Sequence, residues 1–115
     1  RTYATDVLLP FMIFVETSVF TSQLHELLSD DEYSEFQQFL VGDPLAGDVI
    51  KDTGGLRKVR WAAGGKGKRG GVRVIYYFVD EADQIRLLLI YKKGIQDDLT
   101  AAQRKQLKAI KDRWT

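Results

Sequence analysis

The sequence predicts an α+β fold in which a small antiparallel sheet packs against an N-terminal helix pair and a C-terminal helix. Apolar residues recur at helical spacing in two segments before residue 42 and in one segment after residue 100. Three runs between residues 56 and 92 alternate instead with a period of two, which is typical of strands. An early strand and a meander of these three strands would form the sheet.

The first expected elements are a strand and a helix. Residues 13–16 are apolar and β-branched, which favours a strand. Thr17 or Ser18 then begins a helix with a single apolar stripe. This stripe consists of Phe20, Leu24, Leu27 and Leu28.

The second helix has a sharper start signal. Ser29 and Glu32 have the spacing of a capping box, in which each side chain accepts a hydrogen bond from the other residue's backbone amide. Gly42 and Pro44 end the helix. Its buried face is expected to consist of Tyr33, Phe36 and Leu40.

The strands follow a loop over residues 43–55. They are expected over residues 56–61, 72–80 and 84–92, where β-branched and aromatic residues are abundant. A turn of three residues joins the last two strands and predicts an antiparallel hairpin, and five glycines in residues 64–71 predict a turn between the first two. Thr100 then caps a last helix, whose apolar stripe consists of Leu107, Ile110 and Trp114.

The length of 115 residues fits one domain. Met12 stands directly before the first strand, so we expect residues 1–11 to be an N-terminal extension or a vector-derived remnant and residues 12–115 to be the domain. The chain has no cysteine, which excludes disulfides, thiolate metal sites and a thiol nucleophile. No apolar run is long enough to span a membrane, and a cytoplasmic location is expected.

Charge is divided unequally along the chain. Residues 1–55 contain two basic and ten acidic side chains, a net charge of −8, whereas residues 56–115 contain fifteen basic and six acidic side chains, a net charge of +9. Between Leu56 and Val79 there are seven Lys or Arg residues and no acidic residue. Such a surface attracts a polyanion, and its glycine and strand context favours that interpretation over a merely solvated basic face.

Several kinds of chemistry lack the residues they need. The single histidine, His25, has no neighbouring ligand, and the acidic pairs at residues 30–31 and 97–98 are expected to cap helices. The glycine-rich segment does not match a Walker motif in either possible register. We therefore expect no metal ion and no cofactor.

Clustered cations on the strands suggest another chemistry. Alternation places Lys58 and Arg60 on one side of their strand and Arg57 on the other, and Arg73 is expected on the neighbouring strand. Convergence of these cations beside Tyr76, Tyr77 or Tyr91 would depress a Lys or Tyr pKa and so provide a base without histidine. Arginine would stabilise the charge that develops on phosphate in metal-independent RNA cleavage by the 2′-hydroxyl.

The chain resembles the RelE superfamily of bacterial toxins, and is most similar to its HigB-like members. The resemblance covers residues 12–115 and is specific as a combination of segments. It rests on the early strand, the acidic helix pair, residues 55–60, the basic loop 65–71, the strands 71–78 and 88–93, and a Gln-Arg-Lys-Gln-Leu motif at 103–107.

This resemblance implies a toxin that cuts messenger RNA in the ribosomal A site and is neutralised by a cognate antitoxin. The matching catalytic positions are Arg57, Arg60, Arg73, Tyr91 and Lys93. Arg73 would stabilise the transition state, and Tyr91 or Lys93 would handle the proton. The residues expected to bind RNA or the ribosome are Lys58, Lys66, Lys68 and Arg69.

Two other functions remain open from the sequence. A non-catalytic RNA-binding module would need only the basic surface. A DNA-binding regulator is less favoured because no helix-turn-helix is evident, although operator DNA would be reached indirectly through the antitoxin.

Overall fold

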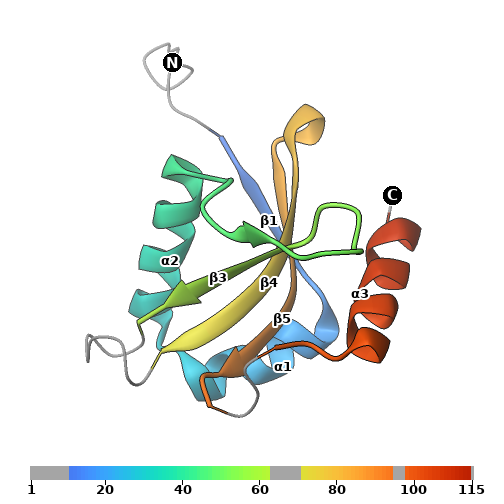
Figure 1. The fold of residues 1–115 in the computed structure, drawn as a ribbon. Coiled ribbons are helices and arrows are strands. Elements are labelled where there is room, and N and C mark those ends of the chain that lie inside the picture. The colour runs from blue at the N-terminus through green and yellow to red at the C-terminus, as the bar shows by residue number, and fades with distance from the viewer. Residues whose placement is uncertain (1–10, 63–70, 95–97, 115) are drawn as a thin grey trace.

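The computed structural model describes residues 11–62, 71–94 and 98–114 and shows an α+β fold with three α-helices and a five-stranded mixed sheet (Figure 1). The strands are β1 (Ile13–Glu16), β2 (Asp48–Val49), β3 (Arg57–Trp61), β4 (Val72–Val79) and β5 (Gln84–Lys92). The helices are α1 (Ser18–Leu27), α2 (Asp30–Gly42) and α3 (Ala101–Arg113), with a short 3₁₀ turn η3 (Asp80–Ala82) between β4 and β5.

The helix starts are those that the sequence predicts. Thr17 caps α1 by accepting a hydrogen bond from the backbone amide of Phe20 at 3.0 Å. Reciprocal capping boxes begin the other two helices, between Ser29 and Glu32 for α2 and between Thr100 and Gln103 for α3. These hydrogen bonds span three residues, so the local sequence suffices to specify them.

The sheet differs from the all-antiparallel prediction in two ways. Its order is β1-β5-β4-β3-β2, and β1 pairs with β5 in parallel, with Ile13 opposite Gln84. The expected loop over residues 43–55 also contains β2, which pairs antiparallel with β3. A strand of two residues has no periodicity to read, and the partner of β1 lies about seventy positions along the chain, so neither feature leaves a local signal.

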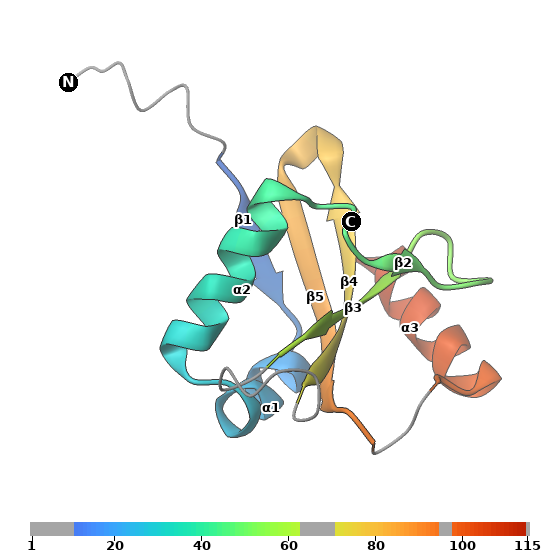
Figure 2. The same ribbon diagram turned by 60° about the vertical axis from the view of Figure 1, so that its left-hand side comes forward.

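The helices cover opposite faces of the sheet (Figure 2). The helices α1 and α2 pack on one face, where Phe20, Phe36 and Leu40 are fully buried among residues of β3, β4 and β5. The helix α3 packs on the other face, where Leu107 joins a smaller cluster with Leu56 and Ile75. Because α1 and α2 contain acids but no Lys or Arg, whereas α3 contains five cations, the sheet separates an acidic helix layer from a basic helix.

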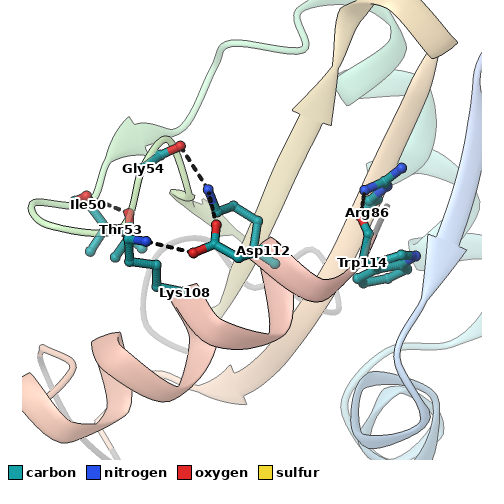
Figure 3. A network of polar contacts seen from close by, with 8 residues as sticks. Ile50, Thr53, Gly54, Arg86, Lys108, Asp112 and Trp114 are labelled. Atoms are coloured by element: carbon teal, nitrogen blue, oxygen red, sulfur yellow. Dashed lines mark hydrogen bonds and ion pairs between the residues drawn. The ribbon is translucent and has the colours of Figure 1, made fainter.

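Polar contacts along its last turns hold α3 against the sheet (Figure 3). Lys111 donates a hydrogen bond to the carbonyl oxygen of Gly54 at 3.2 Å and lies over the ring of Tyr77. Arg86 of β5 donates to the carbonyl oxygen of Trp114 and lies over its indole ring. These contacts anchor the C-terminal end of α3, while its N-terminal end leads back to the strand ends that carry the candidate site.

No helix within the described ranges is both long enough and apolar enough to cross a membrane.

Candidate functional site

Cross-strand pairing brings two arginines and a tyrosine together on the α3 side of the sheet. Arg60 of β3 lies directly opposite Arg73 of β4, and Arg73 lies directly opposite Tyr91 of β5. Residues paired in this way project from the same face, with their β-carbons about 5 Å apart. Lys58, two residues before Arg60, shares this face.

A hollow of about 690 Å³ opens over these strands, and we call it the cationic hollow. It contains four basic side chains and two carboxylates. Its lining residues are Ala46, Asp48, Lys58, Val59, Arg60, Arg73, Lys93 and Asp98.

The two arginines are an unusual pair for a sheet. Like charges directly opposite each other destabilise a strand pair, so the arrangement is unfavourable for folding alone. Within the described part of the chain, neither Arg60 nor Arg73 has a carboxylate at ion-pair distance. Local choices that oppose stability are expected at functional sites, and an anionic ligand would relieve this one.

The hydroxyl of Tyr91 is buried beside this cluster. Among the described residues it is the one buried side-chain polar atom without a hydrogen-bond partner. Burial raises its pKa, a nearby Asp98 acts in the same direction, and Arg73 opposes them. The expectation that the cations would depress a tyrosine pKa is therefore wrong for Tyr91, which keeps its proton at neutral pH.

Asp98 is a site residue that the sequence interpretation missed. It was expected to help cap the last helix, but Thr100 is the N-cap of α3. The Asp98 carboxylate instead accepts a hydrogen bond from Lys58 Nζ at 3.1 Å. Asp48 was missed because it lies on β2, whose pairing places it opposite Lys58. Only long-range pairing identifies either carboxylate.

Arg57 does not join the cationic hollow. It lies on the other face of β3, and its guanidinium donates hydrogen bonds to the carbonyl oxygens of Gly47 at 2.7 Å and Leu45 at 3.3 Å. Tyr76 binds the same loop, because its hydroxyl donates to the Pro44 carbonyl oxygen and accepts from the Gly47 amide. These contacts indicate that Arg57 and Tyr76 hold the loop that precedes β2.

The structure therefore unites four of the five predicted catalytic residues, namely Arg60, Arg73, Tyr91 and Lys93, together with the predicted RNA-binding residue Lys58. Three other residues predicted to bind RNA, Lys66, Lys68 and Arg69, lie outside the described residues. The site contains four cationic hydrogen-bond donors that can bind a phosphate, two carboxylates, and beside them the protonated hydroxyl of Tyr91.

The chain is similar to chains in several solved structures. No protein-family model matches the chain. A chain in the crystal structure of an archaeal RelE-RelB complex from Pyrococcus horikoshii is 24% identical in sequence, with a TM-score of 0.47. The similarity covers 74% of the present chain and 98% of that chain.

Proposed function

We propose that this protein is a RelE-type toxin of HigB-like character that cleaves messenger RNA on the ribosome. The observation that carries the proposal is the placement of Arg60 opposite Arg73 in the lining of the cationic hollow, with Tyr91 opposite Arg73 on the next strand. The sequence resemblance supplies the class of reaction. The geometry supports it because Arg60 and Arg73, which have no carboxylate at ion-pair distance among the described residues, lie side by side where a phosphate would bind.

The proposed reaction is attack of a ribose 2′-oxygen on the adjacent phosphorus. A bond forms from the 2′-oxygen to phosphorus, the bond from phosphorus to the 5′-oxygen breaks, and the products are a 2′,3′-cyclic phosphate and a 5′-hydroxyl. Arg73 and Arg60 stabilise the negative charge that develops on the phosphate oxygens. Neither a metal ion nor a cofactor takes part.

Two protons must move in this reaction. Tyr91 is protonated at neutral pH and has no internal acceptor among the described residues, so it can give its proton to the leaving 5′-oxygen. Lys93 lines the same hollow, and we assign to its amine the acceptance of the 2′-hydroxyl proton as the 2′-oxygen attacks. This assignment gives each of the two proton-handling residues a separate role.

The partners follow from the same proposal. We infer that a cognate antitoxin neutralises the protein, that the ribosome presents the messenger RNA, and that operator DNA is contacted only through the antitoxin. The reaction would take place in the cytoplasm. Lys58 binds the RNA beside the scissile phosphate, and Lys66, Lys68 and Arg69 remain proposed contacts to ribosomal RNA. Arg57, which holds the loop before β2, is left out of the catalytic group.

A non-catalytic RNA-binding module is the second candidate, because the same cations would bind a phosphate chain without cutting it. Primer extension on a translated messenger RNA, with free RNA in parallel, separates the two. The proteins compared are the wild type, Arg73→Ala and a control, Arg113→Ala, which removes the same charge from an exposed position at the end of α3.

Wild type and Arg113→Ala should cut translated RNA only, and Arg73→Ala should be slower by about 10²- to 10³-fold, as for the loss of one transition-state donor. RNA binding without cleavage by all three proteins would replace the toxin by the binding module. Equal cleavage by Arg73→Ala and wild type would remove Arg73 from the site.

A further inference from the structure

A second hollow of about 370 Å³ adjoins the cationic hollow, and we call it the side hollow. Asp48, Lys58 and Asp98 line both. The two therefore form neighbouring compartments on one face of the protein. The volume lies within the range of about 300–1,000 Å³ that is usual for small-molecule sites.

The wall between the compartments is an ion pair that water reaches easily. Lys58 Nζ lies 3.1 Å from Asp98 Oδ1, and the Asp98 side chain is 86% exposed. The Lys58 side chain is 26% exposed, so a ligand can reach this pair from solvent. A single ligand can therefore occupy both compartments.

The side hollow differs in chemistry from its neighbour. Ile50, which packs against the α3-side cluster, and the buried Leu99 contribute apolar surface. The charged side chains of its lining are two carboxylates, the exposed Asp48 and Asp98, and three cations, Lys51, Lys58 and Arg104. Apolar surface beside a hydrogen-bond acceptor suits a flat, partly polar group.

Single-stranded RNA offers both kinds of group in turn, a charged phosphate and then a largely apolar base. Each phosphate is joined through a ribose to a nucleobase whose faces are apolar and whose edge carries donors and acceptors, and single-stranded RNA is read by such unstacked bases. A carboxylate accepts hydrogen bonds from amino groups, such as N4 of cytosine, and uracil has none. The Asp48 carboxylate therefore favours a base with an exocyclic amine.

We propose that the side hollow binds the nucleobase next to the scissile phosphate, and that Asp48 selects bases with an exocyclic amino group over uracil. The proposal deepens the proposed function and rests on it. It makes Asp48 a specificity-determining residue on the rim of the site, distinct from the residues that act on the phosphate.

The test compares wild type with Asp48→Asn, in which an acceptor-only side chain gains a donor while its size is kept. Glu35→Gln is the control, because Glu35 is an exposed acid on α2, on the opposite face of the sheet. Cleavage of a translated RNA library with a randomised codon is sequenced. Wild type and Glu35→Gln should disfavour uracil at one position beside the cut, and Asp48→Asn should relax this preference by about tenfold, the size expected of one charge-assisted hydrogen bond.

A binding assay separates failure of this proposal from failure of the proposed function. The tetranucleotides rC4 and rU4 differ at the 4-position of the base, which is an amine in cytosine and a carbonyl in uracil, and at N3, which is protonated only in uracil. Fluorescence anisotropy at low salt should show tighter binding of rC4 by wild type and equal binding of the two by Asp48→Asn. Loss of cleavage with this preference intact would reject the nuclease and keep the side hollow. Active enzyme with the same uracil frequency in wild type and Asp48→Asn, or equal binding of rC4 and rU4 by wild type, would overturn the proposal.

Discussion

Substitution of two buried tyrosines tests which hydroxyl stabilises the fold and which is available to a ligand. Tyr76 and Tyr91 lie on neighbouring strands, and burial raises the pKa of each, so both are protonated at pH 7. Tyr76 has two hydrogen-bond partners, the Gly47 amide at 2.9 Å and the Pro44 carbonyl oxygen at 2.8 Å. Tyr91 has none among the described residues. Replacing each by Phe removes a single oxygen atom with opposite expected effects.

Tyr76→Phe should destabilise the protein, because it leaves the buried Gly47 amide and the Pro44 carbonyl without their partner. The expected cost is about 2 kcal/mol, from about 1–3 kcal/mol for an unsatisfied buried group, and it would lower Tm by roughly 8 °C. Tyr91→Phe removes a hydroxyl that has no hydrogen-bond partner in the described part of the fold. It should cost no stability and raise the free energy of unfolding by up to about 1 kcal/mol.

Urea unfolding at pH 7, followed by circular dichroism and by tryptophan fluorescence, measures both values. The rate of cleavage of translated messenger RNA should show the opposite pattern, with the larger loss in Tyr91→Phe. Tyr91→Phe should lose about 10²- to 10⁴-fold in rate as a general acid is removed, and Tyr76→Phe should keep the wild-type rate per folded molecule. Destabilisation of Tyr91→Phe to the level of Tyr76→Phe would mean that its hydroxyl has a structural partner, and our reasoning about its role would be refuted.

Two other substitutions test the division between fold and site. Arg57→Ala should lower the free energy of unfolding by about 1–2 kcal/mol through lost hydrogen bonds to the Gly47 loop, and should leave the salt dependence of RNA binding unchanged; a reduced salt slope would place Arg57 on the RNA. The pKa of Asp112 is lowered by hydrogen bonds from Lys108 and Lys111, so its contribution to stability is present above its ordinary pKa of 3.8 and is lost as the pH falls through the lower, folded value. Asp112→Asn should weaken this acid dependence in unfolding measured from pH 6 to pH 2, and an unchanged pH profile would contradict it.

The local sequence determined where the helices begin and which residues of the strands share a face. The capping boxes at Ser29 and Thr100 fix where α2 and α3 begin, because their hydrogen bonds close over three residues. The short turn after β4 requires an antiparallel hairpin with β5, and alternation then assigns each residue to a face. These rules were enough to predict that Arg60 and Lys58 share a face of the sheet and that Arg73 lies on the next strand.

Tertiary structure alone decided how the site is completed. The register that places Arg73 opposite both Arg60 and Tyr91 depends on hydrogen bonds between strands, and the packing of α3 brings Asp98 to Lys58. The pKa of Tyr91 rises because burial outweighs Arg73, and burial is a property of the packed molecule. Sequence specifies contacts that close within a few residues, whereas pairing and burial between distant segments arise only when the whole chain has folded.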